Sequence, residues 1–223
     1  MSWSALMLLF VALYAGFKCL GIGREQENLK FLGLTMASFL FALTETSILI
    51  DSLIEGSNSL YANQIVEWTH ILILSFVLSS LAIFIRQSKP VFAQFPLVYA
   101  GLPFLIVISY FLVKDTYALK EWLMSIYQGG AILVGLLMYS VYTYREQRHW
   151  IILAGMILFT ITFITYWYVP NVQQAYAWIW EALLGCSTLT VVYGYDYALK
   201  QGAVKENDYQ GHPSESDVLL DRS

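Results

Sequence analysis

The third apolar segment of the chain, residues 61–86, reads YANQIVEWTHILILSFVLSSLAIFIR. It is longer than the roughly 20 residues that an α-helix needs to cross the hydrocarbon core of a bilayer. It nevertheless carries a carboxylate and an imidazole, Glu67 and His70, near its beginning. A charged side chain inside hydrocarbon costs about 2.5 kcal/mol or more, so an ionisable residue at this depth suggests a functional site. The segment therefore predicts a membrane helix with a polar site in it.

The composition of the whole chain agrees with a membrane protein. Of its 223 residues, 58% are hydrophobic and 13% are charged, and the mean hydropathy is +0.58. Soluble domains carry about 25% charged residues, so this chain has too few to cover a water-facing surface. We expect its main partner to be the lipid bilayer. The net charge of −4 comes partly from an acidic tail and gives no reason to expect nucleic acid as a partner.

Seven apolar segments predict an all-α fold, a seven-transmembrane-helix up-and-down bundle. The predicted spans are 3–22, 31–53, 61–86, 95–113, 122–144, 150–169 and 175–199. The polar connectors between them are too short to hold a second domain, so residues 1–200 are expected to form one bundle that satisfies its backbone polar groups internally. Residues 201–223 are polar and are predicted to be a disordered acidic cytoplasmic tail.

The distribution of basic residues predicts the orientation. Cytoplasmic loops carry an excess of lysine and arginine. One set of segment ends carries Lys18, Arg24, Lys30, Arg86, Lys89, Arg145, Arg148, Lys200 and Lys205, whereas the other set carries only Lys114 and Lys120. The amino terminus is therefore expected outside and the carboxyl terminus in the cytoplasm, in a multi-pass protein of the inner (plasma) membrane. Trp3, Trp122, Trp178 and Trp180 near the predicted outer ends fit an aromatic belt.

Polar side chains of four predicted spans lie at a similar depth. Counting from the outer ends at 1.5 Å per residue places Glu45, Glu67, His70, Gln128 and Glu181 roughly 9–14 Å below those ends. Tyr127 and Tyr166 are expected in or beside this layer, with Asp51 nearer the surface. The sequence therefore predicts a buried polar site in the outer half of the bundle.

The spacing of Glu67 and His70 favours a metal site. Residues three apart share a helix face, and Glu-x-x-His supplies ligands in carboxylate-bridged sites of helical bundles. With Glu45 and Glu181 as further ligands, the set suits a single divalent ion: iron, manganese or zinc. Gln128, Tyr127, Tyr166 and Asp51 would surround it, orienting the ligands or contacting a bound molecule. His70 is the one histidine in the predicted spans, so a haem with two histidine ligands is excluded.

Two other functions use the same residues. The carboxyl groups could handle protons or a small polar solute in a transporter or a receptor-like protein, with His70 as the pH-responsive member. Alternatively, hydrogen bonds among them could only fix the packing of the helices, in a non-catalytic subunit of a larger membrane complex or in a homo-oligomer. No catalytic or nucleotide-binding motif is present, so the sequence favours a protein that is not an enzyme.

Three short stretches resemble microbial rhodopsins. The pair Glu67-Trp68 is similar to their acidic residue-Trp pair on the third span, and Glu181 stands where a second counter-ion would lie. The resemblance implies the same seven-span topology. However, the seventh span has no lysine before Lys200, and Gly185 stands at the position expected for it. Covalent retinal is therefore excluded.

Two packing features are also predicted. Gly129, Gly130 and Gly135 on the fifth span are expected to allow close approach of a neighbouring helix. Asp196, near the inner end of the seventh span, is expected to form an ion pair with an arginine: Arg24, Arg145 or Arg148.

Overall fold

The computed structural model describes residues 3–26, 29–53, 60–88, 105, 107–110, 112, 117–169 and 176–211, and no strand occurs among them. The predicted all-α class is thus confirmed. The helices are α1 (Trp3–Gln26), α2 (Leu29–Leu53), α3 (Leu60–Ser88), α5 (Tyr117–Arg145), the 3-10 helix η2 (Gln147–His149), α6 (Trp150–Tyr168) and α7 (Ala177–Gly211). Most of the predicted fourth span, 95–113, and the end of the tail, 212–223, lie outside the described residues.

Five of these helices are long and apolar enough to cross a membrane: α1, α2, α3, α5 and α6. Their outward surfaces carry large apolar side chains, among them Phe10, Phe17, Leu32, Leu133 and Leu137. A soluble monomer rarely exposes such extensive apolar surface, whereas a lipid-facing bundle requires it. The protein is therefore a membrane protein with several spanning helices.

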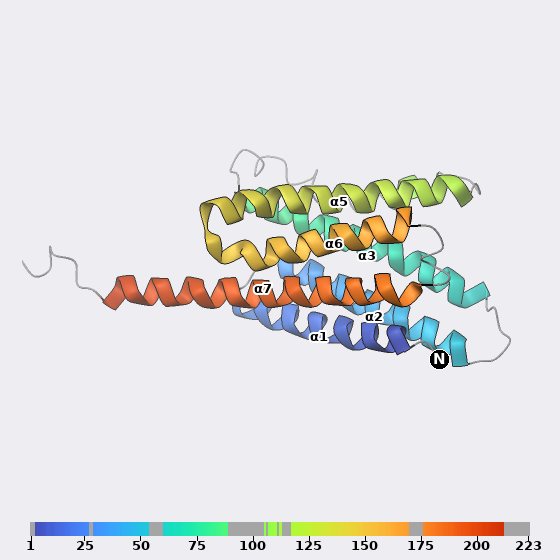
Figure 1. Ribbon diagram of the computed structural model, residues 1–223, viewed down its shortest axis with the longest axis horizontal. Helices are drawn as coiled ribbons and strands as arrows, with labels where there is room; N and C mark the ends of the chain where they lie inside the picture. The colour runs from blue at the N-terminus through green and yellow to red at the C-terminus, as the bar shows by residue number, and fades with distance from the viewer. Residues whose placement is uncertain are drawn as a thin grey trace, which may run out of the picture.

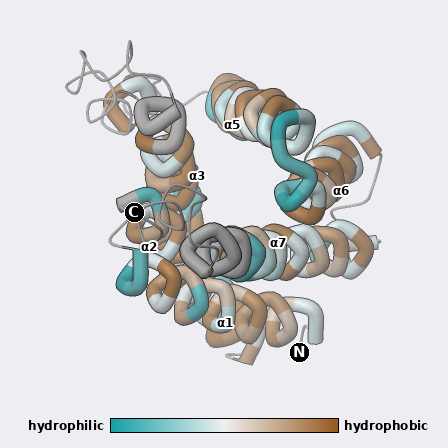
Figure 2. Tube along the Cα trace, turned by 90° about the vertical axis from the view of Figure 1, so that its left-hand side faces the viewer, coloured by the Kyte–Doolittle hydropathy of each residue, from teal (hydrophilic) through white to brown (hydrophobic). Residues whose placement is uncertain are grey.

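The helices form a bundle in which chain neighbours pack together and the last helix returns to the first. α1 packs on α2, α2 on α3, α5 on α6 and α6 on α7, and α7 also packs on α1 (Figure 1). The end-on view shows α7 between α6 and α1 (Figure 2). In Figure 1, α1, α3, α5 and α7 all begin at the right-hand end, whereas α2 and α6 end there. The described helices thus run up and down as predicted.

The inward stripe of α1 shows why the helices pack as they do. Its buried residues recur every three or four positions and are mostly small: Ala5, Leu8, Ala12, Ala15, Cys19 and Ile22. This spacing matches one face of a 3.6-residue helix. Small residues on this face let α2 and α7 come close, which produces packing attraction where lipid provides no hydrophobic driving force.

Hydroxyl side chains inside the helices mostly bond back to the helix backbone. In α2, Thr35 and Thr46 donate to the carbonyl oxygens of Phe31 and Ala42, each at 2.7 Å. Such bonds satisfy a polar group that has no water partner in hydrocarbon. They explain how a helix rich in serine and threonine still crosses a bilayer.

The ends of the helices follow local sequence. Val169, after α6, has an extended backbone with φ −87° and ψ 119°. It precedes Pro170, and the residue before a proline is pushed out of the helical region. At the other end of the chain, α7 continues past Gln201 to Gly211, into the segment predicted as tail.

Among the described glycines, an added Cβ would come closest to the backbone of a facing helix at Gly155, on α6, and at Gly194, on α7. A Cβ added to Gly155 would lie 2.9 Å from the backbone nitrogen of Val191, and one added to Gly194 would lie 2.8 Å from that of Ile152. Of the predicted glycines, Gly129 and Gly135 face α6 side chains, whereas a Cβ on Gly130 would meet nothing within 4 Å. The close approach predicted at Gly130 is therefore not found among the described residues.

Candidate functional site

Two acidic residues predicted for the site interact inside the bundle. The side chain of Glu45, on α2, is buried, with the residue only 5% exposed. Its carboxyl group lies within electrostatic range of Glu181 on α7. The structure thus brings together carboxyl groups from helices far apart in the sequence.

Three buried polar atoms on α2 and α7 lack hydrogen-bonding partners among the described residues. The Oε2 atom of Glu181 is buried and has no hydrogen-bonding partner among the described residues. The same holds for the indole Nε1 of the adjacent Trp180 and for Oδ1 of Asp51, on the outer part of α2. A buried polar group without a partner costs about 1–3 kcal/mol, so such groups need an explanation. A bound water would be a partner for any of these atoms, whereas a proton or a cation would be a partner only for the carboxyl oxygens of Glu181 and Asp51.

Glu67 has different partners. Its Oε1 accepts a hydrogen bond from the hydroxyl of Tyr110 and one from the ammonium group of Lys120, on α5, at 3.1 Å. Lys120 also lies over the Tyr110 ring, with its Nζ 4.9 Å from the centroid. The carboxylate therefore already has a cationic partner and two donors, and it is about two-fifths exposed.

The rotation of α3 explains this arrangement. Thr69 is buried and its hydroxyl accepts a hydrogen bond at 2.7 Å from Thr44, on α2. Successive helical residues turn by about 100°, so Glu67 and His70 point away from the face that carries Thr69. His70 is accordingly exposed, whereas Thr69 faces α2. Glu67 and His70 share a face, as predicted, but this face is not the one toward Glu45.

Within the described part of the chain, no group of three or more histidine, cysteine, aspartate or glutamate side chains could hold a metal ion. The predicted ligands Glu45, Glu67, His70 and Glu181 therefore do not form one cluster in this arrangement. The single-metal site stays a prediction.

The residues predicted to surround the metal site contact different partners. Trp167 donates its indole N–H to the side-chain oxygen of Gln128 at 3.0 Å, which joins α6 to α5. The hydroxyl of Tyr127 is bonded to Ser109 at 2.7 Å. Tyr166 packs edge-on against Trp180, with ring centroids 5.0 Å apart, and so lies beside the residue that precedes Glu181. Of these three residues, Tyr166 has a contact that leads toward the carboxyl pair.

Sequence reasoning missed two members of the outer polar layer, Tyr110 and Trp180. Trp180 was interpreted as an interface anchor, and Tyr110 belongs to a segment selected only for its apolar character. A signal for Tyr110 is present in retrospect: a hydroxyl inside an apolar span needs a hydrogen-bonding partner.

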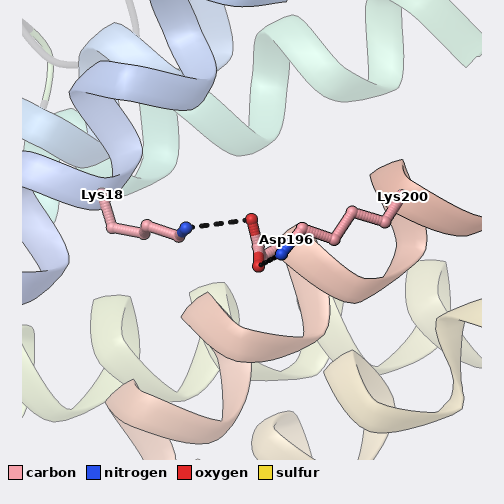
Figure 3. Close-up of polar contacts among 3 residues, drawn as sticks. All are labelled: Lys18, Asp196 and Lys200. Atoms are coloured by element: carbon pink, nitrogen blue, oxygen red, sulfur yellow. Dashed lines mark hydrogen bonds and ion pairs between the residues drawn. The ribbon is translucent and has the colours of Figure 1, made fainter. Parts of the chain in front are cut away.

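A second polar cluster lies at the opposite end of the bundle. Asp196, on α7, binds Lys18, on α1, at 3.0 Å and Lys200 at 2.8 Å (Figure 3). The ion pair expected for Asp196 thus forms, but with lysines. Arg148, one of the expected arginines, instead pairs with Glu146.

A pair of tyrosines lies beside this cluster. The hydroxyls of Tyr139, on α5, and Tyr195, on α7, are hydrogen-bonded to each other. Their rings and that of Phe31 meet edge-on. The bond joins α5 to α7 in the half of the bundle opposite the carboxyl pair.

The position expected for a retinal lysine faces α1. A Cβ on Gly185 would contact Met7 and Leu8, at 3.0 and 3.5 Å, so a side chain there would point to α1. Comparisons with protein-family models, with curated proteins and with solved structures gave no match. The functional argument therefore relies on the geometry of the site.

Proposed function

We propose that this membrane protein binds a proton or a small cation between Glu45 and Glu181, as a transporter or a receptor-like seven-helix protein does. The observation that supports this proposal is that the buried Glu45 on α2 lies within electrostatic range of Glu181 on α7, whose Oε2 atom is buried without a partner among the described residues. The alternative of a purely structural network needs donors for these groups, yet Oε2 of Glu181 has none among the described residues.

Elementary electrostatics favours an occupant at this pair. Two neighbouring carboxylates repel each other, and the repulsion is strong where water is scarce. A shared proton or a cation removes the repulsion and supplies the missing partner of Oε2. An intramembrane carboxyl pair is also a common element of proton and ion pathways.

The proposed topology has seven spans, with the amino terminus outside and the carboxyl terminus in the cytoplasm. α3 and α5 run in the same direction, so the intervening chain has to return to the starting end, which supports residues 95–113 as a further span. Basic residues gather at the end where α1 finishes, which supports its cytoplasmic location. In this topology, the carboxyl pair lies in the half of the bilayer that is nearer to the outside. The membrane itself is the inner (plasma) membrane of the cell.

Infrared difference spectroscopy on the purified, reconstituted protein tests the carboxyl pair. We expect the carbonyl band of a protonated carboxyl group to disappear as the pH rises, and to be reduced in both Glu45→Gln and Glu181→Gln. Glu146→Gln, which changes an exposed carboxylate, is the matched control. An identical band in all four proteins would overturn the proposal, and no such band in any of them would exclude the proton as the occupant and leave only a cation.

A divalent metal ion is the alternative occupant. Glu45 and Glu181 would supply two oxygen ligands, and Glu67 and His70 could join them only after α3 turned and Glu67 left Lys120. Elemental analysis of protein purified without chelator or histidine tag tests this, beside Glu181→Gln, Glu67→Gln and His70→Ala. Metal lost only with Glu181→Gln would identify the carboxyl pair as its site, and metal lost with His70→Ala would favour the Glu-x-x-His site.

Reporter fusions test the topology independently. Green fluorescent protein fused after Ser223 should fluoresce, and alkaline phosphatase at the same point should be inactive. The opposite result would reverse the orientation without affecting the carboxyl pair.

A further inference from the structure

The cluster of Lys18, Asp196 and Lys200 carries more positive charge than its internal contacts neutralise. Each lysine ammonium binds a different oxygen of the one carboxylate, Lys18 at Oδ1 and Lys200 at Oδ2. Two cations and one anion leave a net charge of +1. The pair of Lys120 and Glu67 near the outer end has no net charge, since it contains one cation and one anion.

The excess charge lies on the outward surface of the bundle. The side chain of Lys200 is 73% exposed and that of Lys18 is 36% exposed, whereas Asp196 beneath them is only 20% exposed. Figure 3 shows the carboxylate between the two lysines, which reach it from different helices. A ligand arriving from the membrane would therefore meet the ammonium groups first.

Exposed aromatic residues flank the lysines. Tyr14, on α1, and Tyr193, on α7, lie within electrostatic range of Lys200, and both side chains are exposed. Phe17 adds an exposed ring on α1, next to Lys18 in the sequence. Tyrosine combines a ring that packs on acyl chains with a hydroxyl that bonds polar groups. Charge and aromatic surface thus coincide at the seam between α1 and α7.

We propose that the phosphate of an anionic lipid binds at this seam, between Lys18 and Lys200. One negative charge would neutralise the cluster, the lysines would donate to the phosphate oxygens, and the exposed rings would pack against the lipid chains. Basic sites between membrane helices on the cytoplasmic side recognise anionic headgroups in this way. The proposal goes beyond the carboxyl pair and depends on the orientation only for the leaflet involved.

Native mass spectrometry of the purified full chain tests the site. The protein is exchanged into detergent with equal amounts of phosphatidylglycerol and phosphatidylcholine, and the retained lipids are counted. The wild type should retain phosphatidylglycerol preferentially, and Lys18→Gln and Lys200→Gln should each weaken that retention by about fivefold. Lys200→Arg, which keeps the charge, should retain phosphatidylglycerol as well as the wild type does. Lys120→Gln is the matched control, because it removes the same charge from the balanced outer pair.

Asp196→Asn gives the most discriminating result. Removing the competing carboxylate leaves both lysines unneutralised, so retention of phosphatidylglycerol should increase. A decrease to the level of the lysine variants would mean that the three residues form only a structural ion-pair network, and would overturn the proposal. Equal retention by the wild type, Lys200→Gln and Lys120→Gln would overturn it as well.

Inorganic phosphate distinguishes a lipid from a soluble anion. Phosphate added to the lipid-loaded protein should leave the bound phosphatidylglycerol in place, because it has no chains to pack on Tyr14, Phe17 and Tyr193. Displacement of the lipid at low phosphate concentration would assign the site to a soluble anion instead. The exposed position of Lys200 means that its substitution is expected to leave folding intact, and size-exclusion chromatography verifies this.

Discussion

Thr44 donates a hydrogen bond to the hydroxyl of Thr69 at 2.7 Å, across the interface of α2 and α3. Thr69 in turn donates to the carbonyl oxygen of Ile65 at 2.8 Å, so the hydroxyl protons of both threonines have an acceptor. The bond fixes how α3 is rotated relative to α2. This rotation directs Glu67 toward Lys120, away from Glu45.

Removing this bond should loosen the interface by a small, measurable amount. Thr44→Val and Thr69→Val keep the side-chain shape and delete the hydroxyls. Interhelical hydrogen bonds in membrane proteins contribute about 0.6 kcal/mol on average and about 1.7 kcal/mol at most. We expect a coupling energy in this range from a double-mutant cycle on the free energy of unfolding in bicelles. Additive effects of the two substitutions would show that the bond contributes nothing.

Alanine at the α6–α7 contact should be strongly destabilising. Gly155→Ala and Gly194→Ala place a methyl group against the backbone of the facing helix, which cannot move independently. Overpacking of this kind costs about 1–3 kcal/mol. Gly130→Ala, which meets nothing within 4 Å, is the control and should gain up to about 1 kcal/mol through helix propensity. Thermal unfolding followed by tryptophan fluorescence measures all three; equal melting temperatures would contradict the close contact.

The Tyr139–Tyr195 bond should protect the thiol of Cys19. Cys19 is buried and free, and it lies within electrostatic range of Tyr195. Tyr195→Phe removes one partner of the Tyr139 hydroxyl, and a hydrogen bond contributes about 1 kcal/mol. If local opening exposes the thiol, its reaction with N-ethylmaleimide should become about fivefold faster.

Two changes make the labelling experiment specific. Cys186 is exposed, so it is replaced by serine in every protein compared. Tyr193→Phe, which deletes a hydroxyl from an exposed ring of the same helix, is the control and should leave the rate unchanged. Equal rates for Tyr195→Phe and Tyr193→Phe would show that the buried bond does not hold this region closed.

The ion pairs of Asp196 should stabilise the folded state at neutral pH, and this stabilisation should be lost at high pH. The hydrogen bond from Lys200 to Asp196, and then their charge interaction, raise the pKa of Lys200 above its usual value of 10.5. A lysine whose pKa is higher in the folded state stabilises that state fully below the unfolded pKa, and loses this contribution as the pH rises through the folded pKa. Asp196→Asn should therefore be less stable than the wild type at pH 8, and the difference should narrow above about pH 10.5. A pH-independent difference in melting temperature would show that packing, and not charge, causes the effect.

Much of the fold could be predicted from the sequence because hydrophobic length is a local property. An apolar run long enough to cross a bilayer has to be helical, since only a helix satisfies its backbone polar groups within one segment. The predicted span 150–169 accordingly differs by one residue at its end from α6, Trp150–Tyr168. The opposite directions of α1 and α2, and of α5 and α6, follow from their short connectors, which can join only neighbouring helix ends.

The partners of the polar residues could not be predicted in this way. Depth along a helix follows from counting residues, but the direction of a side chain also depends on rotation about the helix axis. Glu67 and Glu45 lie at similar predicted depths, yet only Glu45 interacts with Glu181. Asp196 similarly binds Lys18 and Lys200, although arginines lie near the same end of the bundle.

The sequence by itself therefore determined the all-α membrane class and the approximate positions of the described helices, because these depend on apolar length. It also determined the opposite directions of helices joined by a short connector, such as α1 and α2. The tertiary structure alone decided which polar groups meet. Small residues such as Gly155 and Gly194 let helices approach until backbones touch, and the Thr44–Thr69 bond holds one rotation of α3. These contacts join residues distant in the chain, so no local pattern encodes them, and they bring Glu45 and Glu181 together while leaving Glu67 with Lys120.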